Sequence, residues 1–306
     1  MALKQQLSVH SEDRDIKKWP QSNHFEVDLP VDYKSVAMMR LNDIELPASF
    51  NVFSPENQNT KIAFIVAATT YVAEITSGTY TPTQMGLELT GQMNAAYNNA
   101  FIVVYNEISQ TFLFSGTDPF AIDFTTSHYD GTYYNNYAAW GLGFNLGFQK
   151  KKYISNYLTV NFYWNATTYT DKNIIVSPNT IDLFGDSAVY MEVFLFNSMD
   201  EIMPYTERSN HVYGAKQCGK HNSAFAKIPI SNRHTYDGNC MGHSYMDRHN
   251  LVTNIFRSEP PLERIQKLKF KFRFHDGRLV DFGTREFSFT IELTLARTDI
   301  PNFTNE

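Results

Sequence analysis

Short stretches in which apolar and polar side chains alternate dominate the chain. Phe25 to Leu29 alternates strictly, and Val36 to Leu46 forms a longer run. Because a period of two residues places successive side chains on opposite faces of a strand, each stretch predicts a strand with one buried face. Pro30 and Pro47 are expected to end these strands, since proline lacks the N–H that a sheet requires.

Further strand-like segments follow along the chain. Two of them flank a short polar loop, Asn106–Gln110, and this spacing predicts a β-hairpin. The segments are Phe50–Phe53, Lys61–Val66, Val72–Ile75, Phe101–Tyr105, Thr111–Ser115, Val189–Phe196 and Ala224–Ile230.

The strongest alternation lies near the C-terminus. Asp276-Gly277 predicts a turn, because this pair tolerates positive φ, and the flanking runs predict a hairpin over Leu268–Leu295. Its inner face is expected to carry Leu268, Phe270, Phe272, Phe274, Phe287, Phe289, Ile291, Leu293 and Leu295. Together with the first strand, this pattern predicts a core that contains Phe25, Val27, Phe270, Phe272, Phe289 and Ile291.

One segment has the pattern of a helix. Thr81-Pro82-Thr83-Gln84 is a capping box, with a threonine N-cap, proline at the first helical position and glutamine three residues after the cap. Met85, Leu89, Met93 and Ala96 then recur at helical spacing. Gly86 and Gly91 weaken the helix, so we expect it to depend on packing against a sheet.

These elements predict an all-β fold, an antiparallel jelly-roll β-sandwich with one short helix and long loop insertions. Alternation of strands with helices, which would indicate a parallel sheet, is missing from the pattern. We expect an extended N-terminal arm over residues 1–22, a jelly-roll domain over 23–298 and a tail over 299–306. Residues 116–185 and 231–260 have little periodicity and are expected to be loop insertions, with short strands interrupting the first of them.

Composition narrows the class of protein. The net charge is −6 and the pI is about 5.9, so no specific nucleic-acid binding is expected. Only two cysteines are present, Cys218 and Cys240, which favours a reducing compartment. The N-terminal residues lack the apolar stretch of a signal peptide. The apolar run Ile62–Ala68 is far shorter than the roughly 20 residues that span a bilayer.

A resemblance to a known family rests on several stretches and on their order along the chain. They are SEDRDIKKWPQSNHFEVDLP (residues 11–30), VAMMRLNDIELPASFNVFS (36–54), ITSGTYTPTQMGLEL (75–89), FIVVYNEISQTFLFSG (101–116), GLGF (141–144), VYMEVFLFNSMDEIMPY (189–205), AFAKIPI (224–230) and KLKFKFRFHDGRLVDFGTREFSFTIEL (267–293). In this order they resemble the minor capsid and penton-like jelly-roll proteins of nucleocytoplasmic large DNA viruses, of the chlorella virus type.

The resemblance implies a structural role without catalytic residues or cofactors. We expect a minor capsid protein of a large icosahedral double-stranded DNA virus that bridges or cements major capsomers from the inner side of the shell. Its partners would be the major capsid protein, other minor capsid proteins, further copies of itself and the inner membrane. The protein would be assembled in the host cytoplasm and located in the virion. A penton protein at the capsid vertex is the alternative.

Two pairs of cysteine and histidine raise the question of a metal site. Cys218 with His221, and Cys240 with His243, could supply the two thiolates and two imidazoles of a tetrahedral zinc site. A Cys218–Cys240 disulfide is another interpretation. Two free thiols in a loop rich in Gly, His and Asn are the interpretation we favour, because the spacing alone is not specific.

Four cations, Lys267, Lys269, Lys271 and Arg273, alternate with the apolar residues of the last hairpin. They could meet an acidic capsomer surface, internal nucleic acid or anionic lipid, and together with Trp19 in the arm they form a candidate interface. A solvent-exposed face neutralised by cross-strand partners such as Glu286 and Glu292 is the simpler interpretation.

We also considered enzymatic and glycan-binding functions. The sequence lacks Gly-x-Ser-x-Gly, a phosphate-binding glycine-rich loop, His-Glu-x-x-His and the histidine spacing of a cupin, so no enzyme is predicted. Tyrosines and tryptophans of residues 129–164 could stack on sugars, which would suit a glycan-binding jelly-roll spike module. The same rings could equally anchor a protein interface.

Overall fold

The computed structural model describes residues 3–47, 51–128, 134, 139–162, 167–203, 220–230 and 254–296. The chain divides into two compact units, each with a hydrophobic core of its own. Unit 1 comprises Met1–Phe50, Asp186–Pro204 and Gln217–Glu306, and unit 2 comprises Asn51–Gly185 and Tyr205–Lys216. The single jelly-roll domain expected over 23–298 is therefore two units, because residues 51–185 bury their own core.

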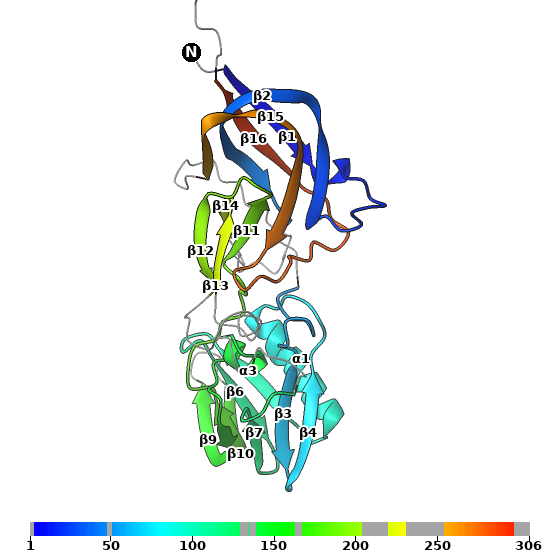
Figure 1. The fold of residues 1–306 in the computed structure, drawn as a ribbon. Helices are drawn as coiled ribbons and strands as arrows, with labels where there is room; N and C mark the ends of the chain where they lie inside the picture. The colour runs from blue at the N-terminus through cyan, green and yellow to red at the C-terminus, as the bar shows by residue number, and fades with distance from the viewer. Residues whose placement is uncertain are drawn as a thin grey trace, which may run out of the picture. The chain divides into compact units, whose positions relative to one another are not determined.

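Unit 1 is built on a six-stranded sheet in the order β1-β16-β2-β15-β11-β14 (Figure 1). Its strands are β1 (Leu3–His10), β2 (His24–Glu45), β11 (Ala188–Val193), β14 (Ala226–Pro229), β15 (Ile255–Arg273) and β16 (Ser288–Leu295). A separate two-stranded sheet pairs β12 (Met199–Met203) with β13 (Lys220–Ala224).

The core of unit 1 confirms the predicted pattern of burial. All six side chains expected inside are buried, namely Phe25, Val27, Phe270, Phe272, Phe289 and Ile291. The rings pack edge to face, as Phe270 and Phe289 do with centroids 4.9 Å apart. Such packing contributes stability beyond the burial of apolar area.

The prediction that Leu268–Leu295 forms a hairpin is wrong, although the prediction of which side chains face the core is correct. β15 and β16 do not pair with each other, because β2 lies between them and pairs with both. The turn itself forms: Gly277 has φ +91°, and the Phe274 N–H donates to the Arg278 carbonyl at 2.8 Å. The chain then leaves the sheet before β16. Alternation shows which face of a strand is buried but does not identify its neighbour.

Two boundaries near the N-terminus also differ from expectation. β2 continues through Pro30, which lies where the pairing of β2 with β15 shifts register between Ile265 and Lys267. Proline is tolerated there because no ladder hydrogen bond is required from its nitrogen. Residues 3–10 of the expected arm form β1, an edge strand paired with β16 from Leu3↔Leu295 to His10↔Ser288.

Unit 2 contains two four-stranded antiparallel sheets, in the orders β5-β6-β10-β9 and β4-β3-β7-β8. The strands are β3 (Lys61–Val66), β4 (Thr69–Glu74), β5 (Ile102–Asn106), β6 (Thr111–Gly116), β7 (Phe120–Asp123), β8 (Lys152–Ile154), β9 (Asn156–Phe162) and β10 (Thr167–Val176). The predicted hairpin is confirmed as β5–β6. Residues 116–185, expected to be a loop insertion interrupted by short strands, supply β7 to β10 and the short helix α3 (Leu142–Asn145) and so form more of the sheets than expected.

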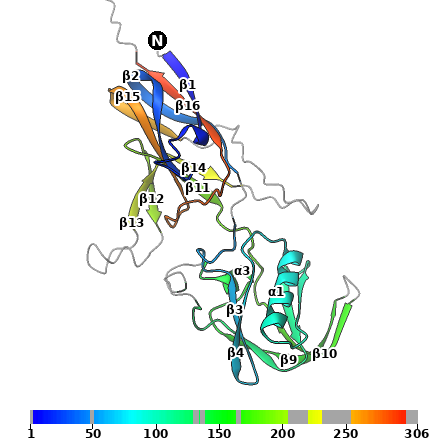
Figure 2. The ribbon, with the colours of Figure 1, turned by 90° about the vertical axis from the view of Figure 1, so that its right-hand side faces the viewer.

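The predicted helix is α1 (Pro82–Ala96), which packs beside β4 and β5 (Figure 2). Its capping box is confirmed, because Thr81 Oγ1 accepts from the Gln84 N–H and the Gln84 side chain accepts from the Thr81 N–H. Gly86 is explained by close packing, since a Cβ there would lie 2.9 Å from the Val103 carbonyl oxygen. The glycine that weakens the helix locally thus lets it approach the sheet.

Every strand pairing in the described part of the chain is antiparallel. The described elements include sixteen strands but only two α-helices, α1 and α3. This confirms the predicted all-β, antiparallel jelly-roll class of fold. The described helices include none that is both long and apolar enough to cross a membrane.

Candidate interaction surface

The cations of β15 lie on the face of the strand opposite the buried phenylalanines. Lys267 is exposed and pairs with two carboxylates of β2, at 2.9 Å from Asp28 Oδ1 and 3.7 Å from Glu26 Oε1. The hydrogen bond to Asp28 raises the pKa of Lys267. These neutralising partners differ from the expected ones, because Glu286 pairs with Arg14 and Glu292 pairs with Lys4.

Lys269 contacts Trp19, the other candidate interface residue. Its Nζ lies 5.1 Å from the centroid of the indole ring, and the Nζ of Lys18 lies 5.4 Å from it. The ring of His24 packs against Trp19 with centroids 4.8 Å apart. Burial, and then the charges of Lys269 and Lys271, lower the pKa of His24. The structure therefore brings Trp19 and the lysines of β15 together on one surface.

Arg273 differs from the three lysines because its side chain is fully buried. It pairs with Glu192 and, at 2.7 Å, with Glu201 of β12, and it donates to the Phe274 carbonyl at 3.1 Å. The guanidinium also lies over Tyr190, 5.2 Å from the ring centroid. Such a site suits arginine, whose planar group can serve several acceptors at once. Arg273 thus ties β12 to β15, and its charge is not on the exposed surface.

The exposed end of β11 was missed by the sequence analysis. Phe194 is 63% exposed and Leu195 is 76% exposed, and we call this pair the β11 knob. The Phe194 N–H donates to the Lys269 carbonyl at 3.0 Å, so the knob adjoins the lysine surface. A usable signal was present, because Val193-Phe194-Leu195-Phe196 is apolar at four successive positions, more than one buried face requires.

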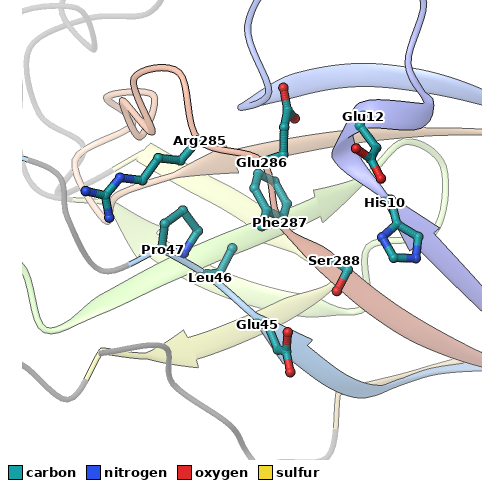
Figure 3. A pocket seen from close by; sticks show the side chains of 9 residues that line it. All are labelled: His10, Glu12, Glu45, Leu46, Pro47, Arg285, Glu286, Phe287 and Ser288. Atoms are coloured by element: carbon teal, nitrogen blue, oxygen red, sulfur yellow. The ribbon is translucent and has the colours of Figure 1, made fainter. Parts of the chain in front are cut away.

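A pocket of about 420 Å³ opens elsewhere in unit 1 (Figure 3). Leu46, Pro47 and Phe287 form its apolar part, and the carboxylates of Glu12, Glu45 and Glu286 stand around them. The remaining lining residues are His10, Arg285 and Ser288.

Glu286 differs from the other two carboxylates of this pocket, because its charge is already compensated. It accepts hydrogen bonds from Arg14 and Ser11, each at 2.5 Å. The bond from Arg14, followed by the one from Ser11, outweighs burial and lowers the pKa of Glu286.

The zinc hypothesis falls largely on residues outside the described part of the chain. Cys218, Cys240 and His243 lie there, and His221 is placed in β13 without a described side chain. Among the described residues, no group of three or more His, Cys, Asp or Glu side chains could hold a metal ion. The zinc set, the disulfide and the free thiols all stay predictions.

Two of the aromatic residues considered for sugar binding pack within unit 2. Trp140 meets Phe124 edge to face at 5.5 Å, and Tyr153 meets Phe148 at 4.9 Å. Both rings border the core of that unit. Tyr157 is 67% exposed. The described rings therefore serve packing more than they form an open stacking platform.

These features define the class of protein only broadly, as an all-β protein of two units with an aromatic and cationic surface on unit 1. No family model matches the chain, and no curated protein matches it. Among solved structures, the mavirus penton protein has 8% identity and a TM-score of 0.48, with 96% of this chain and 99% of that chain covered. A structure of the Sputnik virophage has 10% identity and a TM-score of 0.43, with coverages of 95% and 97%. Both scores lie below 0.5, so these similarities are too low to assign a function.

Proposed function

We propose that the chain is a structural component of a viral capsid, a minor capsid protein that bridges or cements major capsomers of a large icosahedral DNA virus from the inner side. The family resemblance of the ordered sequence stretches supports the capsid setting. The observation that supports docking is the β11 knob beside Trp19 and the lysines of β15. Large apolar side chains that are exposed together are typical of protein interfaces.

The chemistry of this surface suits docking to protein. The knob supplies apolar area that gains free energy when it leaves water, at about 25 cal/mol per Å². Trp19 is an amphipathic ring of the kind enriched at interface hot spots. The ion pairs of Lys267 with β2 lie at the edge, where charges orient a partner more than they add affinity. The partners would be the major capsid protein and other minor capsid proteins.

The first test is the composition of purified virions. A bridging component should be present at a fixed ratio below that of the major capsid protein, as measured by quantitative mass spectrometry. Absence from virions would refute the capsid role. Selective binding on a glycan array, without incorporation into particles, would favour a glycan-binding module instead.

The second test separates the surface from the fold. Lys269→Ala should change the free energy of unfolding by less than about 0.5 kcal/mol, because the side chain is only half-buried and makes no ion pair with a buried group. It should nevertheless reduce incorporation into particles. Lys152→Ala, at an exposed lysine of unit 2, is the matched control and should leave incorporation unchanged. Equal incorporation of the two variants would exclude the lysine surface as the interface.

A further inference from the structure

We propose that the β11 knob docks into the pocket bordered by Glu12 and Glu45 on a second copy of this chain, so that copies associate head to tail. The inference rests on the docking role proposed for this surface and names its partner. The knob and the pocket both belong to unit 1, so their description does not depend on how the two units are placed.

The turn that carries the knob is held in an uncommon conformation. Leu195 has φ +71°, in the left-handed region that leucine rarely adopts. Three hydrogen bonds hold the turn: Phe194 N–H to the Lys269 carbonyl, Phe196 N–H to the Val193 carbonyl at 2.9 Å, and Val193 N–H to Asn197 Oδ1 at 2.9 Å. Strained backbone that is held in this way is more frequent at functional sites. Here it projects two large apolar side chains into solvent.

The pocket complements the β11 knob in size, in its apolar lining and in charge. Its volume of about 420 Å³ can receive side chains of this size, and its apolar part, around Pro47 and Phe287, offers a place for them. The carboxylates of Glu12 and Glu45 are on exposed residues at its border (Figure 3). Lys269 adjoins the knob, because its carbonyl accepts from the Phe194 N–H, so a cation next to the knob would meet the carboxylates of Glu12 and Glu45 beside the pocket.

The positions of the two features in the sheet make the contact asymmetric. The pocket takes residues from the ends of β1 and β2 and the start of β16, whereas the knob ends β11. β2 and β15 lie between β16 and β11, which puts the last two strands about 14 Å apart at the usual strand spacing. A contact between two different patches is heterologous, so it propagates from copy to copy until a ring closes or a chain extends.

The test is self-association of the full chain, measured by sedimentation velocity over a range of concentrations. We expect concentration-dependent oligomers of the natural sequence below about 1 mM. Leu195→Gly removes the side chain and suits the left-handed backbone, so it should fold well and weaken association by at least about 30-fold, the loss typical of a hot spot. Glu45→Arg, at the exposed border of the pocket, should weaken association similarly. Leu158→Gly, at an exposed leucine of unit 2, is the control and should associate normally.

Mixing the two variants tests the head-to-tail geometry itself. The Glu45→Arg chain keeps its knob and the Leu195→Gly chain keeps its pocket, so the mixture should form one-to-one dimers that grow no further. A mixture that stays monomeric would overturn the proposal, as would a natural chain that is monomeric at about 1 mM. Either result would leave the virion measurements with Lys269→Ala to decide the capsid role separately.

Discussion

Replacement of Arg273 by methionine should strongly destabilise unit 1. The arginine side chain is fully buried between Glu192 and Glu201 and holds β12 against β15. Methionine is of similar length but cannot serve either carboxylate. Glu192 would keep Lys271 at 3.3 Å and is partly exposed, so water could compensate much of its charge. Glu201 is 6% exposed and, among the described residues, would retain only His275 and the Tyr190 hydroxyl as partners, so most of the penalty should arise there.

The magnitude follows from the cost of an unpaired buried charge. Removal of one partner of a buried ion pair typically costs about 3–5 kcal/mol. The stability of a whole domain is about 5–15 kcal/mol, so the Arg273→Met variant should be close to unfolding under native conditions. Removal of Glu201 as well, in Arg273→Met with Glu201→Leu, should restore more than half of the loss, because no charge is then left without a partner.

The appropriate assay is urea unfolding in which hydrogen exchange of the amides in β11 and β15 is used to monitor unit 1. The two units can unfold separately, so a signal averaged over the whole chain would not assign the loss to unit 1. Lys267→Met, at an exposed position of the same strand, is the control and should change stability by less than about 0.5 kcal/mol. A loss below about 1 kcal/mol in Arg273→Met, or a double variant less stable than the single one, would refute the reasoning.

Three further predictions concern other parts of the fold. Phe272→Ala should cost about 3–5 kcal/mol in thermal or urea unfolding, because the ring is buried among aromatic neighbours, and a harmless substitution would contradict the assigned packing. Thr81→Ala should cost about 0.5–2 kcal/mol in unit 2 through loss of the helix cap, and Thr81→Asp should keep most of that stability. Glu286 has a lowered pKa in the folded state, so its contribution is complete above its ordinary pKa and is lost as the pH falls through the lowered value. Glu286→Gln should therefore make the free energy of unfolding depend less steeply on pH in that acidic range. An unchanged pH dependence of the free energy of unfolding would count against the ion pair with Arg14.

Local sequence patterns were sufficient to predict several features of this protein. The capping box at Thr81 and Gln84 uses groups three residues apart, so α1 could be predicted without knowledge of its surroundings. Alternation identified the buried faces of β2, β15 and β16, because successive side chains of a strand point to opposite sides. The all-β class follows from these two signals together.

The composition of residues 116–185 misled the prediction. Their abundance of glycine, asparagine and tyrosine is typical of loops, yet they form β7 to β10 of a second unit. Alternation over such short strands is weak, so their pairing with neighbouring strands decides their conformation. Of the insertion expected over 231–260, residues 231–253 lie outside the described part of the chain and stay a prediction, whereas residues 255–260 belong to strand β15.

The class of fold, the buried faces of the strands and the one substantial helix could be predicted from the sequence, because each depends on neighbours a few residues away. Three features arise only in the folded chain: β2 separates β15 from β16, β1 joins the sheet as an edge strand, and Arg273 is buried whereas Lys267 on the same strand is exposed. These outcomes depend on contacts between residues up to hundreds of positions apart. The alternating sequence pattern is the same for a lysine in water and for an arginine between two carboxylates. Only the elements that pack against that face of the strand distinguish the two environments.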